Sequence, residues 1–286
     1  KQPLKALDYA KKAVILSPLN EWYLFNLAVL YQEIEDYKNS AETFLILSKI
    51  NPEKISYLFS LTEQLLENQN YKKAIVVLNK IENKIGLKED ISIQKHQIYT
   101  YLRKKKKAIK ELETLIYDYP KNLRSLGLLA EYYENINKSS KAKNLLDKMM
   151  IIDSSNGLVR LSLFQHFYKK KQFKRSYREL LNVMRSSELE ENLKKQILLE
   201  ISYVQNSPFS LYQVSKLIQN FISIHPKNSD VLLMMGDLKI FQMQEDSACY
   251  YFRKSLDINP LPFKAWKQLI SSSLVRNRYD ITINDS

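Results

Sequence analysis

The sequence predicts an all-α protein, a solenoid of antiparallel helix pairs, and three observations lead to this fold class. The chain of 286 residues contains only 4 glycines, too few for a sheet protein rich in tight hairpins or for glycine-rich phosphate loops. Prolines are separated by 34 residues or by twice that number, in the two series Pro18, Pro52, Pro120 and Pro226, Pro260. Small residues recur with the same period at Ala6, Ser40, Ala74, Ala108, Ala142 and Ser176.

A period of this length fits one pair of helices per repeat. The small residues lie where the two helices of a pair cross, because a large side chain would hold the helices apart. Four positions further on, a large apolar residue fills the core, at Phe44, Leu78, Leu112, Leu146 and Leu180. Proline ends the second helix, since the residue before it resists the helical conformation. Each pair leaves an apolar face that the next pair covers, which gives a stacked solenoid.

This pattern resembles the tetratricopeptide repeat (TPR) family, whose unit is two antiparallel helices in 34 residues. Residues 21–54 match the positions that this family prefers with Leu24, Leu27, Ala28, Tyr31, Ser40, Phe44, Leu47 and Pro52. Residues 229–262 match less fully, because Lys239 and Ser255 replace the preferred tyrosine and alanine. The resemblance implies a right-handed TPR superhelical solenoid.

We expect a single TPR array over residues 1–286, as a segment of a chain that continues in both directions. Residues 1–20 supply the second helix of a first repeat, and residues 263–280 supply a final partial repeat. The full repeats between them are 21–54, 55–88, 89–122, 123–156, 157–190, 195–228 and 229–262.

The step between the sixth and seventh repeats is longer than the others, 38 residues instead of 34. This difference predicts four inserted residues around 186–196, either as a lengthened loop or helix or as a functional bend or docking point. The seventh repeat turns at residues 206–209, where we expect Ser207 to cap the second helix and Pro208 to occupy its first position.

The chain lacks the residue patterns of catalysis and of metal or cofactor binding. Its one cysteine, Cys249, excludes an internal disulfide and any cysteine-based zinc site. His96, His166 and His225 fall at different positions of their repeats, without metal-ligand spacing. Nucleophile motifs, P-loops and dinucleotide fingerprints are absent from the sequence. We therefore expect a protein that is not an enzyme and has no catalytic, cofactor or metal site.

The resemblance also implies a partner groove, lined by positions 2, 5, 9, 12 and 13 of each first helix. These positions are acidic at Glu33, Glu63, Glu67, Asp90, Glu131, Glu134, Asp230 and Asp237, and basic at Arg124, Lys169, Lys264 and Lys267. Eight acidic against four basic residues give the groove about −4, within a chain of net charge +13. The excess positive charge, about +17, therefore lies outside the groove, which argues against a nucleic-acid strand bound there.

Apolar and aromatic residues at the same positions are candidate anchors for a protein partner. They include Trp22, Phe25, Phe59, Tyr101, Leu161, Tyr168, Tyr203, Leu233 and Phe241. An alternative is that some of them are buried under neighbouring repeats or covered by a terminal segment of the same chain.

A basic edge is predicted where the first helix of a repeat turns into the second. It comprises Arg103, Lys104, Lys105, Lys106 and Lys107 in the fourth repeat, and Lys169, Lys170 and Lys171 two repeats later. We interpret this edge as a solvated surface, with contact to an acidic partner or to lipid head groups as the alternative.

The function predicted is a non-enzymatic scaffold that binds protein partners, in a multi-subunit complex and without a small-molecule substrate. The order of repeat variants resembles long periplasmic TPR lipoproteins of the Gram-negative outer membrane. This resemblance implies a subunit of a protein assembly or secretion machine, held at the inner face of the outer membrane by an upstream lipid anchor rather than by this segment. Two alternatives are a cytoplasmic TPR regulator or co-chaperone, and a basic-edge binder of nucleic acid or anionic surfaces.

Overall fold

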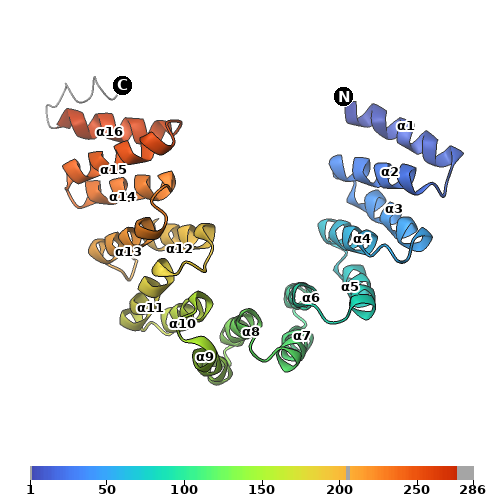
Figure 1. Cartoon of the computed structure of the whole chain (residues 1–286), viewed down its shortest axis with the longest axis horizontal. Coiled ribbons are helices and arrows are strands. Elements are labelled where there is room, and N and C mark those ends of the chain that lie inside the picture. Colours follow the sequence, from blue (N-terminus) through green and yellow to red (C-terminus); the bar gives the residue numbers. More distant parts are fainter. Residues whose placement is uncertain (1, 204–206, 276–286) are drawn as a thin grey trace. The chain divides into compact units, whose positions relative to one another are not determined.

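The computed structural model describes residues 2–203 and 207–275, and within these ranges it contains sixteen α-helices and no strand (Figure 1). No helix in these ranges is long and apolar enough to cross a membrane. The chain divides into two compact units, Lys1–Ser125 and Leu126–Ser286, and the boundary falls within α8.

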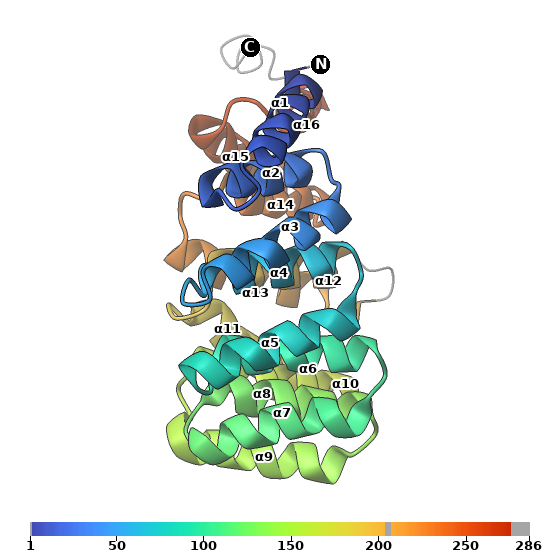
Figure 2. The ribbon, with the colours of Figure 1, turned by 90° about the vertical axis from the view of Figure 1, so that its right-hand side faces the viewer.

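Unit 1 comprises the helices up to the start of α8. They are α1 (Gln2–Leu16), α2 (Glu21–Glu33), α3 (Tyr37–Ile50), α4 (Ser56–Glu67), α5 (Tyr71–Ile85), α6 (Glu89–Tyr101) and α7 (Lys105–Asp118). Sequential helices pack against each other, and Figure 2 shows α5, α6 and α7 lying side by side. Asn20, Asp36 and Asn70 begin α2, α3 and α5 by accepting a hydrogen bond from a backbone N–H three residues further on.

Unit 2 contains the rest of α8 (Leu123–Asn135) and the helices that follow. They are α9 (Ser139–Asp153), α10 (Gly157–Lys169), α11 (Phe173–Arg185), α12 (Glu191–Tyr203), α13 (Leu211–Ile224), α14 (Ser229–Phe241), α15 (Glu245–Ile258) and α16 (Phe263–Val275).

The core follows the predicted series of small and large residues. Ser40, Ala74, Ala108, Ala142 and Ser176 are wholly buried, as are Leu78, Leu112 and Leu180, with Phe44 and Leu146 nearly so. Ala6 is the exception and is exposed, because no helix of the described chain precedes α1 to cross it. Gly236 shows how tight the crossing is, since a Cβ atom there would lie 2.3 Å from the Phe252 ring. The helix pairs thus meet at these small side chains, as the sequence predicts.

The turn inside six of the helix pairs, all except α12 and α13, has a constant geometry. Its central residue adopts a left-handed backbone conformation at Glu35, Gln69, Arg103, Asn137, Lys171 and Met243, with φ between 54° and 60°. The next residue donates its N–H back to the last turn of the first helix, as in Asp36 to Tyr31 O at 2.8 Å. This is a Schellman-type helix ending without the usual glycine.

The predicted site of the four-residue insertion is wrong. First helices begin at Gly157 and Glu191, a regular step of 34, whereas second helices begin at Phe173 and Leu211, a step of 38. The extra residues therefore lie between α12 and α13, and the seventh helix pair begins at Glu191 rather than at 195. Glu188 stands where most other repeats have the proline that ends the second helix, so no proline marked this boundary in the sequence.

The predicted cap of α13 is also wrong. Ser210, not Ser207, accepts from the N–H of Gln213, and the Gln213 side chain accepts from the Ser210 N–H in return. This capping box satisfies two otherwise unpaired helix donors at once. Pro208 consequently lies in the loop before the helix and not at its first position.

Candidate partner-binding groove

The predicted anchors of unit 1 lie on α2, α4 and α6, the first helices of their pairs, and are open to solvent. Trp22 is 69% exposed, Phe25 42%, Phe59 44% and Tyr101 64%. Tyr101 is also held by its own unit, since its ring lies 4.5 Å from that of Tyr71. Large exposed aromatic side chains on neighbouring helices are the composition of a protein-binding surface.

Two of these anchors line a cavity of about 570 Å³ between α2 and α4. Its lining residues are Glu21, Trp22, Phe25, Lys54, Ser56, Tyr57 and Ser60. The Phe25 ring lies 6.3 Å from the rings of both Phe44 and Tyr57, measured between centroids. The inner edge of Phe25 is thus packed on the core, while the rest of the ring remains available to a ligand.

A polar network holds the wall of this cavity. The Tyr57 hydroxyl donates to the Glu21 carboxylate, and Lys54 Nζ donates to Glu21 Oε1 at 2.9 Å and to the Tyr57 oxygen at 2.7 Å. The hydrogen bonds from Tyr57 and Lys54 hold the pKa of Glu21 below its usual range. Burial, with the hydrogen bond to Glu21, raises the pKa of Tyr57. The wall is therefore an ion pair at neutral pH, fixed before any partner arrives.

Sequence reasoning missed this network, but a signal for it exists. Glu21, Glu89 and Glu191 each open the first helix of a repeat, and each contacts the turn that leads into the next first helix. Glu191 accepts from Asn228 and lies 3.2 Å from His225 Nδ1. A glutamate at the first position of a repeat thus links it to the following repeat.

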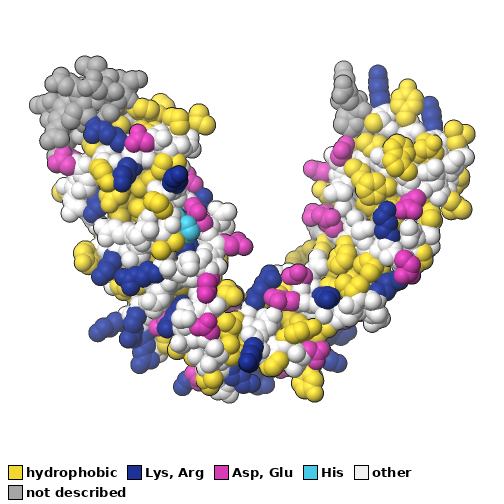
Figure 3. All heavy atoms as spheres, in the orientation of Figure 1, with side chains coloured by type: hydrophobic (Ala, Val, Ile, Leu, Met, Phe, Trp, Pro, Cys, Tyr) yellow, Lys and Arg dark blue, Asp and Glu magenta, His cyan; other side chains and the backbone are white. Residues whose placement is uncertain are grey.

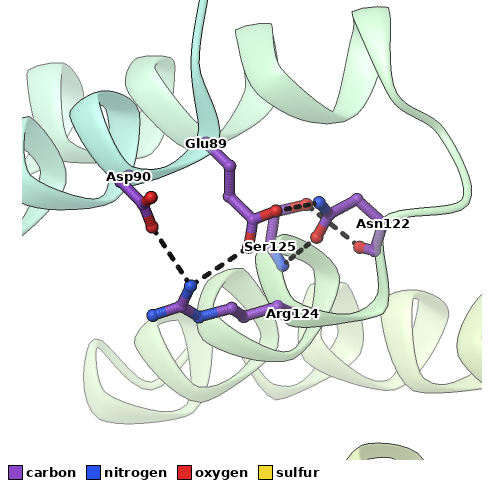
Figure 4. Close-up of polar contacts among 5 residues, drawn as sticks. All are labelled: Glu89, Asp90, Asn122, Arg124 and Ser125. Carbon is purple, nitrogen blue, oxygen red and sulfur yellow. Dashed lines mark hydrogen bonds and ion pairs between the residues drawn. The ribbon is translucent and has the colours of Figure 1, made fainter.

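Figure 4 shows this link at Glu89. Its carboxylate accepts from Asn122 Nδ2 at 2.7 Å and from Arg124 Nη1 at 3.4 Å. Arg124 also reaches Asp90 at 3.3 Å, and Asn122 caps α8 by accepting from the Ser125 N–H at 2.8 Å. Arg124, the basic groove position of unit 1, is consequently neutralised by two carboxylates.

The acidic groove positions of unit 1 lie towards the ends of the same helices. Glu33 on α2, and Glu63 and Glu67 on α4, are exposed, and no ion pair joins them to a cation among the described residues. Phe59, Glu63 and Glu67 follow one another at intervals of four residues, so they share one face of α4. Acidic (magenta) and hydrophobic (yellow) side chains are both visible over unit 1 in Figure 3.

The predicted anchors of unit 2 are mostly packed within the unit. Leu161 is half-buried against the core around α11 and α13, and Leu233 against the core around α15. The Tyr168 ring lies 5.7–6.1 Å from Phe164, Phe173 and Phe209. Phe241 is 72% exposed, whereas the Tyr203 side chain lies outside the described residues. Exposed anchors are thus more numerous in unit 1 than among the described residues of unit 2, where Phe241 is open to solvent and Tyr168 is 37% exposed.

The charged groove positions of unit 2 are largely paired internally. Glu134 is buried and contacts His166 Nδ1 at 2.8 Å and the Ser139 hydroxyl at 3.0 Å. Lys264 donates to Asp237 at 2.7 Å. Lys195, which the corrected start at 191 brings to position 5, donates to Asp230 at 2.9 Å.

A small cavity of about 160 Å³ lies beside Glu134 and His166. The described part of the chain contains no group of three or more His, Cys, Asp or Glu side chains placed to hold a metal ion. We assign no chemistry to this cavity.

The predicted basic edge lies at the turns between paired helices and at the adjoining helix ends. Arg103 and Lys104 lie in the turn between α6 and α7, and Lys105, Lys106 and Lys107 open α7. Lys169 ends α10 and donates to Asn135 Oδ1 at 2.9 Å, while Lys170 and Lys171 lie in the next turn. All eight side chains are exposed.

Comparison with known proteins identifies the fold. No family model matches the sequence, and no curated protein matches it. The structure is similar to that of yeast Tom70, with 12% sequence identity, a TM-score of 0.54, and coverage of 98% of this chain and 60% of that one. It is also similar to a structure of Naa15/Naa10 bound to HypK-THB, with 14% identity, a TM-score of 0.50, and coverage of 99% and 55%.

A tetratricopeptide repeat protein from Parabacteroides merdae ATCC 43184 matches as well, with 13% identity, a TM-score of 0.48, and coverage of 88% of this chain and 98% of that one. The chain spans 60% and 55% of the Tom70 and Naa15/Naa10 chains. The packed helix pairs and the likeness to the Tom70 structure confirm the predicted all-α TPR solenoid as a fold. At these identities the likeness concerns the fold alone.

Proposed function

We propose that the chain is a non-enzymatic scaffold, and that α2, α4 and α6 of unit 1 bind an extended segment of a partner protein. The observation that carries the proposal is the cavity between α2 and α4, with Trp22 and Phe25 exposed at its rim. The TPR-like structural neighbours of the chain support the coarser role of a protein-interaction scaffold.

The cavity suits a large apolar side chain of the partner. Aromatic anchors carry much of the binding energy at protein interfaces, because they bury a large area with few rotatable bonds. Tyr57 and Lys54 are already fixed by Glu21, so ordering the cavity wall adds little entropic cost on binding.

The acidic residues near the cavity favour basic residues beside the apolar side chain that the partner inserts. Glu63 follows Phe59 by one helical turn, about 5.4 Å along the axis, which an extended chain spans in about two residues. A lysine or arginine about two residues from the inserted apolar side chain would therefore meet Glu63, and one about four residues away would meet Glu67. The partner segment that fits is apolar at its centre and basic at its flank.

Panning a library of random peptides against the whole chain tests this function. We expect enriched peptides to combine a large apolar residue with nearby lysine or arginine. Trp22→Ala/Phe25→Ala should bind the enriched peptides at least about tenfold more weakly. The matched control is Tyr117→Ala, which removes an aromatic side chain that is 86% exposed on α7 and should bind like the wild type. Equal binding by all three proteins would contradict the proposal.

We further propose that the protein is a periplasmic lipoprotein subunit at the outer membrane, in a multi-subunit assembly or secretion machine. Support comes from the resemblance of its repeat order to such lipoproteins. The sequence upstream of residue 1 and fractionation of cells making the full-length protein test it. A signal peptide that ends in a lipid-bearing cysteine would exclude the cytoplasmic regulator or co-chaperone, and its absence would exclude the lipoprotein.

A further inference from the structure

Two successive turns of unit 2 carry a dense set of cations, which we call the basic patch. Residues 135–143 contribute three and residues 169–178 contribute six, and neither segment contains an acidic residue. The members are Lys138, Lys141, Lys143, Lys169, Lys170, Lys171, Lys174, Arg175 and Arg178.

The two turns touch, so these cations form one surface. Lys170 Nζ donates to the Ser139 hydroxyl, and Lys169 Nζ donates to Asn135 Oδ1 at 2.9 Å. Every side chain of the basic patch is exposed. In Figure 3, Lys and Arg side chains gather over α9, α10 and α11.

The protein itself leaves this charge almost uncompensated. Within the described ranges, the basic patch takes part in one ion pair, between Lys170 and Glu134 at 4.0 Å. Glu134 is buried and already bonded to His166 and Ser139. The charge of the basic patch therefore faces solvent, where it attracts anions within a Debye length of about 8–10 Å.

The cations at the starts of α9 and α11 occupy positions that do not help these helices. Lys138 and Gln172 precede α9 and α11 and make no side-chain cap, whereas Asp36, Asn70 and Ser210 cap α3, α5 and α13. Helix N-termini carry partial positive charge, so cations in the first turn are unfavourable there. Lys169 and Lys170 do suit the C-terminus of α10, where cations are favourable, but local stability gives no reason for the charge at the starts of α9 and α11.

We propose that the basic patch binds the anionic surface of a lipid bilayer. Seven of its members are lysines, which act as hydrated point charges rather than as bidentate readers of single phosphates. The hollow over residues 171–175 is wide and shallow, so it offers no channel for a single strand. The Phe173 ring, 36% exposed, lies among the lysines, where an aromatic side chain can enter the head-group region.

Vesicle co-sedimentation of the whole chain tests the proposal. The probes are vesicles of phosphatidylcholine alone and vesicles of phosphatidylcholine with phosphatidylglycerol. The first variant is Lys138→Glu/Lys141→Glu/Lys174→Glu, whose new acidic residues suit a helix N-terminus and should not lower the melting temperature. Glutamine at the same three positions gives a second variant. The matched control is Lys148→Glu/Lys216→Glu/Lys227→Glu, with the same change in net charge at exposed sites elsewhere in unit 2.

We expect the wild type and the control to bind the anionic vesicles, and the first variant to bind them on the order of 100-fold more weakly. The glutamine variant should fall between them, and added salt should release the wild type. Equal binding to neutral vesicles, or equal loss in the first variant and the control, would overturn the proposal. So would binding to polyglutamate or single-stranded RNA without binding to anionic vesicles.

Discussion

Units 1 and 2 are built from the same helix pair but expose different side chains. In unit 1, Trp22 and Phe25 face solvent, and the groove cation Arg124 is paired with Glu89 and Asp90. In unit 2, Tyr168 packs on neighbouring rings, while the lysine side chains at the turn between α10 and α11 are exposed to solvent. The repeat thus constrains where helices cross and leaves each unit free to present its own surface.

If the two units share one helix-pair core, equivalent core substitutions should destabilise both equally. These substitutions are expected to have the largest effect of those proposed. Leu112 in unit 1 and Leu180 in unit 2 are wholly buried at the same position of their repeats. Substitution of either by alanine should lower the free energy of unfolding by about 2–5 kcal/mol, through lost burial and a residual cavity. Urea denaturation followed by circular dichroism measures the loss. A loss at one site only would show that the two cores are not equivalent.

Two buried lysines offer a sharper contrast. In unit 1, Lys95 Nζ contacts Glu82 at 2.9 Å and Glu111 at 2.8 Å. Burial acts to lower its pKa, but the hydrogen bonds and charges of Glu111 and Glu82 outweigh burial, so the pKa is raised. In unit 2, Lys194 is wholly buried, donates to Ser186 O at 2.8 Å and lies 2.6 Å from His225 Nε2. Burial lowers its pKa.

Methionine at these positions should therefore have opposite effects. Lys95→Met leaves two carboxylates without their shared cation and should destabilise unit 1 by about 2–4 kcal/mol. Lys194→Met replaces a buried cation by an apolar side chain of similar length and should leave unit 2 equally stable or more stable. Thermal denaturation of both variants compares them. Destabilisation of the same size in both would show that Lys194 is as well compensated as Lys95.

The contact between Lys194 and His225 predicts how the stability of unit 2 depends on pH. Burial, and then the charge of Lys194, hold the pKa of His225 below its usual value of 6.5. Between the folded-state pKa of His225 and 6.5, the unfolded state binds more protons than the folded state, so the free energy of unfolding decreases as the pH falls. The contribution of neutral His225 to stability is therefore complete above pH 6.5 and is lost as the pH falls through the folded-state pKa. Melting temperatures between pH 5 and 8 should show this loss in the wild type and a smaller loss in Lys194→Met. An identical profile in both would remove Lys194 from the explanation.

The parts of the fold that could be predicted from sequence are those set by steric limits common to all repeats. Ala74 and Leu78, for example, are buried as expected, because any larger or smaller side chain would separate the helices or leave a cavity. The start of α12 could not be placed, since Glu188 stands where proline would mark it. The Ser210 cap was missed because Ser207 has the same chemistry and lies before a proline.

The candidate site was less predictable, since exposure depends on neighbours that the repeat pattern does not specify. Trp22 and Tyr168 occupy equally plausible groove positions, yet among the described residues Trp22 meets the ring of Tyr23, whereas Tyr168 meets those of Phe164, Phe173 and Phe209. The contact between Glu21 and Tyr57 joins residues of successive repeats, and single positions within one repeat do not reveal it. The roles of the groove residues therefore remain predictions, as do the repeat boundaries apart from the corrected start of the seventh helix pair.

A third contrast concerns Trp22 of unit 1 and Tyr168 of unit 2. Tyr168→Ala should lower the free energy of unfolding by about 1–2 kcal/mol, because it removes contacts with Phe164, Phe173 and Phe209. Trp22→Ala should change it by no more than about 0.5 kcal/mol, since the ring is 69% exposed. Chemical denaturation distinguishes them. If Trp22→Ala were the more destabilising, the anchors of unit 1 would be structural instead of available to a partner.

The smallest effect concerns the left-handed turns, where the two units should again agree. Arg103 and Lys171 adopt φ values of 56° and 57°, which strain a side-chain-bearing residue but not glycine. Arg103→Gly and Lys171→Gly should each stabilise the chain by about 0.5–1 kcal/mol, net of the entropy that glycine adds to the unfolded state. Asn137→Gly is the control, because asparagine already tolerates this conformation and should gain less.

Lys171→Gly should also weaken binding to anionic vesicles, because it removes one cation of the basic patch, while Arg103→Gly in unit 1 should not. A variant that melts at a higher temperature yet binds vesicles less well would separate the stability of the turn from the charge that it carries. Stabilisation without any change in vesicle binding would instead show that Lys171 serves only to complete the turn.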